Sequence, residues 1–176
     1  MRNLLQLNKR IIIFNALKNF IRLKLKDKIL IARVFILTAI ARCAILFVSF
    51  KNLRKHMGKL NEESSFNLRE EDYKVARKIS WSIGKVIKYT PWESKCLVQA
   101  LTAQYLLSHS HIENTLYLGV SKENYINVES KRNNRGNDAE KSNLVAHSWI
   151  RCGSYYVTGG DGSDFKVVAK FTRYEK

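Results

Sequence analysis

Cys96 and His147 are the residues of this 176-residue chain whose types and spacing best fit nucleophilic catalysis. A cysteine thiolate attacks carbonyl carbons, and a neighbouring imidazole can take the thiol proton and later give it to a leaving amine. Cys96 follows the helix-breaking run Thr90-Pro91-Trp92, so it falls near a helix N-terminus. Unpaired N–H groups there favour the thiolate and can receive an oxyanion. The pair therefore predicts cleavage of a peptide bond.

Each of the two residues also has a structural interpretation. A cysteine on an apolar helix is commonly a small buried hydrophobic side chain, and a single histidine is more often structural than catalytic. On a strand, His147 and Trp149 share one face while Ala146 and Ser148 take the other. The catalytic prediction therefore requires this strand to pack across the helix that carries Cys96.

A third group is expected to orient the imidazole by accepting a hydrogen bond from its other ring nitrogen. Asp161 and Asp164 are the candidates, because both follow a predicted strand from Tyr155 to Thr158. Asp161 comes directly after two glycines at the end of that strand and is preferred. Either aspartate also suits a solvated turn.

The elements that must position these residues come in a helix-first, strand-later order. Helical spacing runs from Leu68 to Tyr89 and from about Ser94 to Ser108. Short segments rich in β-branched and aromatic residues follow at 114–121, 145–152, 154–159 and 165–172. This order predicts an α+β fold in which the helix carrying the cysteine packs on an antiparallel sheet.

The net charge of +16 is concentrated in the N-terminal third. Residues 1–60 contain 14 Lys and Arg against Asp27 alone. This asymmetry indicates contact with something acidic, such as anionic lipid, RNA or an acidic protein face, and a solvated basic face is the alternative.

The apolar stretch from Ile29 to Phe50 is about long enough to cross a bilayer, which takes roughly 20 residues. Arg33 and Arg42 lie nine positions apart, on opposite sides of a helix, so one polar face cannot shelter both. We therefore expect a helix that packs on the domain, or lies at a membrane surface or in a partner groove, rather than a spanning helix. Gly58 is a predicted stop for this helical region.

The three cysteines show neither CxxC nor zinc-type spacing, so a disulfide framework or a cysteine metal site is not expected. Residues 1–26 lack the small-residue cleavage chemistry of a signal peptide. A reducing cytoplasm, with peripheral membrane association left open, is the predicted location.

Four segments, taken in order, resemble a known family. They are Pro91-Trp92-Glu93-Ser94-Lys95-Cys96-Leu97-Val98-Gln99-Ala100-Leu101, Leu116-Tyr117-Leu118-Gly119-Val120, Ala146-His147-Ser148-Trp149-Ile150 and Val157-Thr158-Gly159-Gly160. The set resembles the lasso-peptide biosynthesis B2 proteins, the transglutaminase-like cysteine peptidase domain of the microcin J25 processing enzymes. The resemblance covers roughly residues 68–173. It implies a helical N-terminal region over 1–67 and a peptidase domain over 68–176.

The resemblance implies a protease that removes the leader from a ribosomally made lasso precursor. Cys96 and His147 fall on the family's nucleophile and base, and we expect Trp92 and Trp149 to bind the substrate. Family members that keep an aspartate often carry it where this chain reads Thr158-Gly159-Gly160. Asp161 is therefore a displaced candidate, or the triad is a dyad here.

The resemblance also implies partners. We expect a separate leader-recognition protein, because nothing before Leu68 reads as that small domain, and an asparagine-synthetase-like macrolactam cyclase that uses the freed amine. The basic region over 1–60 is a candidate docking surface for either, or a peripheral membrane contact. No cofactor and no specific nucleic acid are expected. A transglutaminase-like acyl transferase, and a basic membrane- or RNA-binding protein with an incidental Cys/His pair, are the alternatives.

Overall fold

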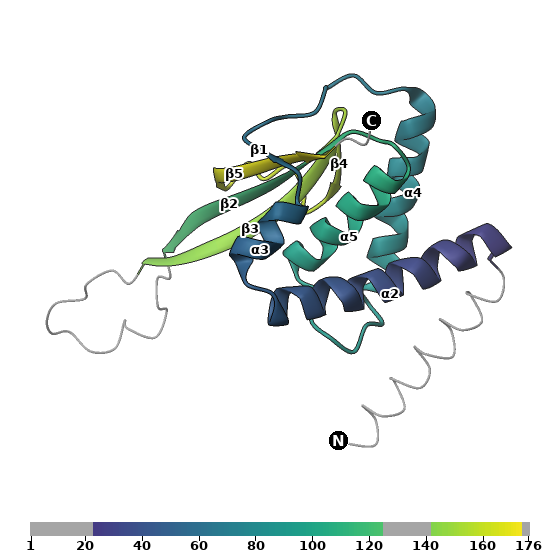
Figure 1. Cartoon of the computed structure of the whole chain (residues 1–176), viewed down its shortest axis with the longest axis horizontal. Helices are drawn as coiled ribbons and strands as arrows, with labels where there is room; N and C mark the ends of the chain where they lie inside the picture. The colour runs from purple at the N-terminus through teal and green to yellow at the C-terminus, as the bar shows by residue number, and fades with distance from the viewer. Residues whose placement is uncertain (1–22, 125–141, 174–176) are drawn as a thin grey trace, which may run out of the picture.

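A computed structural model describes residues 23–124 and 142–173 of the chain. The elements, labelled as in Figure 1, are α2 (Leu25–Phe47), α3 (Phe50–Leu53), the 3-10 turn η1 (Arg54–His56), β1 (Lys59–Leu60), α4 (Glu70–Val86), α5 (Cys96–His109), β2 (Asn114–Asn124), β3 (Ser142–Cys152), β4 (Tyr155–Thr158) and β5 (Lys166–Arg173). Helices precede the long strands in this order. The predicted α+β fold is confirmed.

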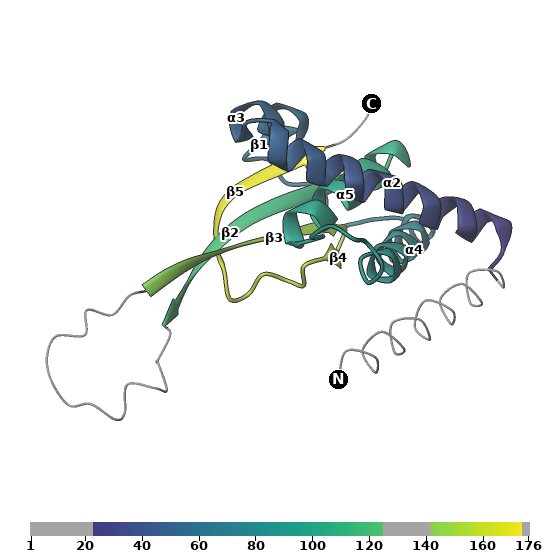
Figure 2. The ribbon, with the colours of Figure 1, turned by 90° about the horizontal axis from the view of Figure 1, so that it is seen from below.

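The strands form one antiparallel sheet in the order β1-β5-β2-β3-β4. Long β2 and β3 lie at its centre, with Leu116 opposite Ile150 and Gly119 opposite His147. Helices α2, α4 and α5 gather on one side of the sheet, while the connection from β4 to β5 passes on the other (Figure 2). The sheet therefore has a helix-covered face and an outer face.

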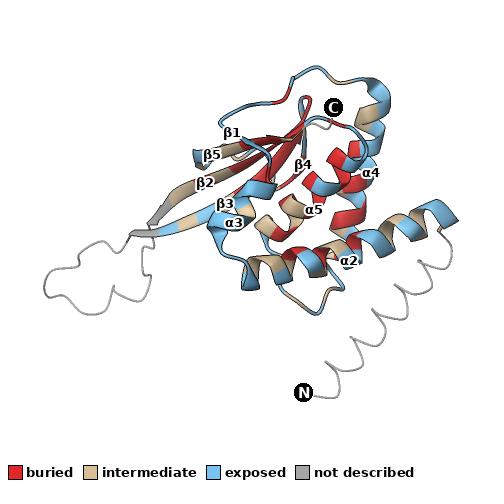
Figure 3. Cartoon of the chain, viewed as in Figure 1, coloured by how far each residue is buried: buried red, intermediate tan, exposed pale blue. Residues whose placement is uncertain are grey.

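The core lies between the helices and the sheet. From α4 it takes Ile79, Ile83 and Val86, which are spaced as one helical face. Val75, one turn before Ile79, is 38% exposed. The helix α5 contributes small and apolar side chains, and the sheet contributes Leu116 and Ile150. Figure 3 shows this buried layer in red where α4 and α5 face the sheet.

Helix α2 packs across α4 and α5. Its buried residues, Val34, Thr38 and Ala41, are spaced as one helical face. It is also long and apolar enough to cross a membrane, a test that the core helix of a soluble protein passes as well. The expected packing of this helix on the domain is present, and much of its outer surface is exposed.

The residues between α2 and α4 join the sheet. β1 pairs with the edge of β5, and Gly58, just before it, has φ +108° and lies against the backbone of Thr172. The predicted helix stop at Gly58 therefore marks the end of η1 rather than of α2, which ends at Phe47. A domain boundary near residue 67 remains a prediction, and these contacts run across it. Residues 1–22 of the basic region lie outside the described residues.

Candidate active site

Cys96 is the first residue of α5, and the turn before it fixes where this helix begins. The Thr90 hydroxyl lies 2.9 Å from the Ser94 hydroxyl, and it donates to the carbonyl oxygens of Ile87 and Trp92. Lys95 is the N-cap, with an extended backbone. These side chain contacts close the segment after α4 and place the thiol at the helix start, as the break at Thr90-Pro91-Trp92 predicted.

The N-terminus of α5 offers backbone donors beside the thiol. The Gln99 N–H is the first that finds an intrahelical partner, the Lys95 carbonyl oxygen at 3.2 Å. Lys95 makes no side-chain capping bond in the described structure, and the Gln99 amide instead donates to the Ser94 carbonyl oxygen at 2.7 Å. The N–H groups of the first turn are thus free to stabilise negative charge on a thiolate or an oxyanion.

The ring of His147 is held by the main chain. Its Nε2 lies 2.8 Å from the carbonyl oxygen of Gly159. Because a carbonyl oxygen can only accept, Nε2 carries the hydrogen, and in the neutral ring Nδ1 keeps the lone pair. The contact therefore selects the tautomer in which Nδ1 is available as a base.

Aromatic side chains on the outer face of the sheet surround this ring. His147 lies 4.7 Å from the Phe165 ring centroid and 5.9 Å from that of Trp149, which in turn stacks on Tyr117 at 5.4 Å. Trp149 is 3% exposed, so in this structure it supports the imidazole and offers little surface to a substrate. Gly119, opposite His147 on β2, leaves room for the cluster.

Replacing Gly119 by alanine should damage this cluster. The new Cβ would lie 2.8 Å from two Trp149 ring carbons and 2.9 Å from the Phe165 Cβ, so both rings must shift. We expect a loss of about 1–3 kcal/mol in the free energy of unfolding, measured by urea denaturation. Gly84→Ala is the matched control, because a Cβ there meets no atom within 4 Å, and alanine in a helix should stabilise by about 0.5–1 kcal/mol. Equal effects of the two changes would contradict the crowding argument.

Asp161 lies in the turn after β4, and its carboxylate is hydrogen-bonded within that turn. Its carboxylate accepts a hydrogen bond from the Ser163 N–H at 3.0 Å, and that bond lowers the pKa of Asp161. In the described residues its carboxylate makes no hydrogen bond to His147, and neither does that of Asp164. The group that meets the imidazole is the Gly159 carbonyl, a main-chain atom for which no residue type is diagnostic.

The structure brings Cys96 and His147 to neighbouring elements without joining them. α5 packs against β3, and its first turn lies beside that strand in both ribbon views (Figures 1 and 2). Ile150 faces the core with α5, so the alternation of the strand directs His147 to the outer face. Among the described residues, no hydrogen bond links the thiol and the imidazole.

β3 has an unpaired edge beside His147 in the described structure. β4 pairs with β3 at Ile150, Arg151 and Cys152, and within the described residues the stretch 144–149 has a partner strand, β2, on its other edge alone. Gly159 continues past β4 along this edge, close to the Ser148 carbonyl. Part of the β3 edge beside His147 is therefore left without a strand partner in the described structure.

Trp92 lies on the helix side of the same region. Its ring packs against Phe35 of α2 with centroids 4.9 Å apart, and its indole N–H is buried without a hydrogen-bond partner in the described structure. Its role in substrate binding remains a prediction. An unpaired buried donor so close in sequence to Cys96 is a polar group that a bound peptide carbonyl could satisfy.

Sequence reasoning missed Arg151, a buried cation four residues beyond His147. It is 1% exposed and donates to the Tyr117 hydroxyl and to the carbonyl oxygens of Ser64 and Gly153. The Tyr117 hydroxyl donates in turn to Glu63. Burial raises the pKa of Tyr117, an effect that the Arg151 charge partly offsets. This network ties the segment before α4 to the outer face beside the aromatic cluster.

A helix that begins with a cysteine and packs on an antiparallel sheet is the arrangement of a transglutaminase-like fold, whose members are commonly cysteine-dependent enzymes. Residues 41–129 match the transglutaminase-like superfamily. The match covers half of the chain, includes Cys96 and ends before His147. The chain therefore belongs to the transglutaminase-like superfamily. No curated protein and no solved structure matches it.

Proposed function

We propose that this chain is a cysteine peptidase that removes the leader from a ribosomally made lasso precursor peptide. Cys96 is the nucleophile and His147 the base. The observation that carries the proposal is the placement of Cys96 at the start of α5, against the strand that carries an imidazole whose Nε2 is already engaged. The order of the PW, LYLGV and AHSW segments favours the lasso family within the wider superfamily.

The proposed reaction runs through a thioester. His147 Nδ1 takes the proton of Cys96, and the thiolate attacks the carbonyl carbon at the end of the leader. Free N–H groups of the first turn of α5 stabilise the oxyanion. The C–N bond then breaks as the imidazolium protonates the leaving amine. Water, deprotonated by His147, hydrolyses the thioester, which releases the leader carboxylate and restores the thiol.

This chemistry requires the thiol and Nδ1 to approach each other in the peptide complex. Catalytic hydrogen bonds are often long or absent before substrate binds and tighten in the complex. The edge of β3 over 144–149 that faces away from β2 is unpaired in the described structure, so a substrate that adds to this edge would lie beside His147. The amine released by cleavage is the group that the expected macrolactam cyclase would join to an acidic side chain.

We propose that the Gly159 carbonyl, rather than an aspartate, orients His147. Asp161→Asn should therefore change kcat/KM by less than about threefold, since the carboxylate is engaged with the Ser163 N–H in its own turn. In catalytic triads, replacing the orienting aspartate by asparagine lowers kcat about 10⁴-fold. A loss of that size, measured with an unchanged melting temperature, would restore Asp161 as the third catalytic residue.

A transglutaminase-like acyl transferase is the second candidate, because the superfamily shares the same acyl-enzyme. The two differ in the acyl acceptor. Purified protein is incubated with a candidate lasso precursor and a candidate leader-recognition protein, and the mass of the leader fragment is measured by mass spectrometry. Hydrolysis in H₂¹⁸O leaves a carboxylate that carries one ¹⁸O. An amide at the same position, formed with an added amine, would identify a transferase. If no product forms that depends on Cys96, both the peptidase and the transferase proposals are wrong.

A further inference from the structure

Helix α2 carries an exposed apolar stripe, termed here the outer stripe. Its members recur every three or four residues along the whole helix, which puts them on one side of it. They are Leu25, Ile29, Ala32, Ile36, Ile40, Cys43 and Phe47. Ile36 and Ile40 are each 58% exposed and Phe47 is 83% exposed. A continuous apolar row of this length on a surface indicates a binding site for an apolar partner.

The opposite side of α2 packs against the rest of the domain. Val34 and Thr38 are fully buried against the helical layer, and Ala41 is 8% exposed. The Arg42 guanidinium forms an ion pair with the carboxylate of Glu93, in the segment before Cys96, with a nitrogen–oxygen distance of 3.2 Å. A membrane-spanning orientation would have to remove this inner side from α4 and α5. The helix can instead lie flat, with the outer stripe facing away from the protein.

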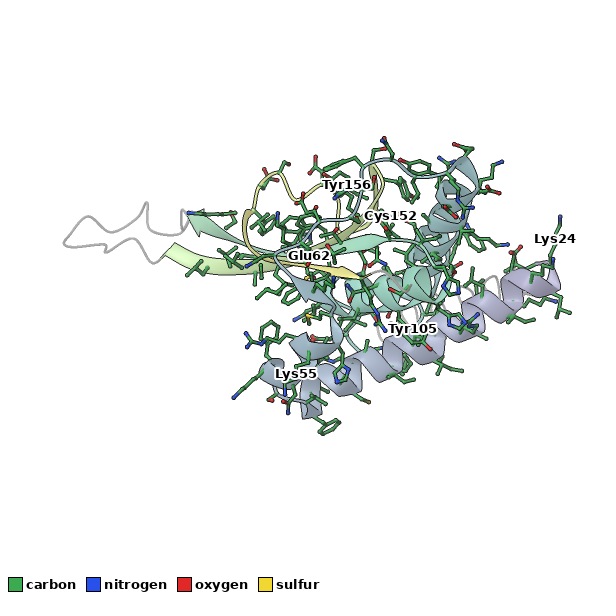
Figure 4. All side chains as sticks on the ribbon, turned by 45° about the horizontal axis from the view of Figure 1, so that its top comes forward. Lys24, Lys55, Glu62, Tyr105, Cys152 and Tyr156 are labelled. Atoms are coloured by element: carbon green, nitrogen blue, oxygen red, sulfur yellow. The ribbon has the colours of Figure 1, made fainter. Side chains whose placement is uncertain are left out.

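Basic residues border the outer stripe. Lys28 and Arg33 lie on its two sides, about 80° and about 60° around the helix from the line through Ile36. Further lysines and arginines lie at the ends, and Figure 4 shows Lys24 and Lys55 at the two ends of the ledge formed by α2 and α3. Over 23–59 the acidic residue is Asp27, which is paired with Lys78. An apolar row with cationic borders fits a surface that is apolar inside and anionic at its rim.

We propose that the outer stripe of α2 binds in the plane of a membrane that contains anionic lipid. The isoleucines and Phe47 enter the boundary between headgroups and acyl chains, and the bordering lysines and arginines meet lipid phosphates. A second copy of this chain is the main competing occupant, because the three-and-four spacing also suits helix pairing. Two antiparallel copies of α2 would bring these cationic borders together, which costs energy, whereas anionic lipid is attracted by them.

Vesicle binding tests this proposal on the full chain. The protein is mixed with vesicles of phosphatidylcholine alone or of phosphatidylcholine with phosphatidylglycerol as the anionic lipid, and the bound fraction is measured by flotation. Anionic vesicles should bind at least about tenfold more protein, and binding should fall when the salt concentration rises from about 0.05 to 0.5 M. The double change Ile36→Gln/Ile40→Gln should weaken binding to anionic vesicles at least about tenfold.

A matched control changes equally exposed apolar residues elsewhere. Val167→Gln/Val168→Gln alters β5, where the two side chains are 45% and 61% exposed, and it should leave binding unchanged. Circular dichroism and the melting temperature verify that both variants fold. Equal binding of the two variants, or no binding of the unmodified protein to either vesicle, would overturn the proposal. A dimer in light scattering that Ile36→Gln/Ile40→Gln dissociates would also overturn it, in favour of a second copy.

Discussion

Replacing Cys96 by alanine is expected to lower the rate of leader cleavage by about 10⁴-fold or more while leaving the melting temperature within about 2 °C. The thiol is the nucleophile in the proposed mechanism, and its loss removes the thioester entirely. Cys96 is only partly buried at the first position of α5, so the smaller side chain leaves no large cavity. Cleavage is measured by mass spectrometry of the precursor and its two fragments.

The other cysteines supply the controls for this prediction. Cys43→Ser replaces an exposed thiol on the outer stripe. The Cys43→Ser protein should cleave the precursor at the normal rate. Cys152 is buried, and burial raises the pKa of its thiol to about 12, so alkylating agents should not reach it as a thiolate at neutral pH. In a Cys43→Ser background, iodoacetamide should therefore label Cys96 selectively. Precursor cleavage by the Cys96→Ala protein would refute the assignment of the nucleophile.

The same labelling reaction isolates the contribution of His147. If His147 Nδ1 receives the thiol proton, His147→Ala should reduce both cleavage, by about 10³-fold or more, and the rate of iodoacetamide labelling at pH 7. His147→Ala also removes the bond to the Gly159 carbonyl, so a structural role would lower the melting temperature without changing the labelling rate of the folded protein. A labelling rate that is unchanged would leave Cys96 without its proposed base.

Replacing Arg151 by methionine should be the most destabilising single change in the sheet, with a loss of about 3–5 kcal/mol in the free energy of unfolding. Methionine keeps the unbranched apolar stem but removes the guanidinium, which leaves the Tyr117 hydroxyl and the Ser64 and Gly153 carbonyl oxygens without their donor. It also removes a cation held 3.8 Å above the Phe66 ring. Urea denaturation measures the loss.

Arg77→Met is the matched control for Arg151→Met. Arg77 pairs with Glu70 at 2.8 Å, but its side chain is 52% exposed and that of Glu70 is 70% exposed. Exposed ion pairs contribute little, so we expect a loss of less than about 0.5 kcal/mol. A loss below about 1 kcal/mol for Arg151→Met would mean that water or a rearranged main chain replaces the guanidinium.

The sequence was informative where a residue type matches one environment. The break at Thr90-Pro91-Trp92 predicted the start of α5, and the alternation around His147 predicted that Trp149 shares its face. The period-two segments predicted the four strands β2 to β5, with differences of a few residues at their ends. Side chains at these positions have a strong preference for burial or for a turn, so the local sequence is sufficient to predict the helix or strand.

The features that escaped prediction depend on contacts distant in sequence or on backbone atoms. Arginine is usually exposed, so the burial of Arg151 follows from the segment before α4, whose Ser64 is 87 positions away. The hydrogen bond from His147 to Gly159 uses a carbonyl oxygen that every residue has. β1, with two residues, is too short for a periodic signal. The helix α2 was expected to pack on the domain, but its outer stripe becomes visible once its inner side is known.

The bond from His147 to a main-chain oxygen has a consequence for how this protein tolerates mutation. A site oriented by a side chain is lost through one codon change, whereas a backbone carbonyl survives any replacement that keeps the local chain path. Gly159 itself has φ +80° and lies against Ser148 and Trp149, so the position is restricted to glycine by space and by conformation. Insertions and deletions between β4 and β5 would displace the oxygen altogether. Replacement of Gly159 and changes in the length of this loop, rather than replacement of the other loop residues, should therefore separate active from inactive descendants of this chain.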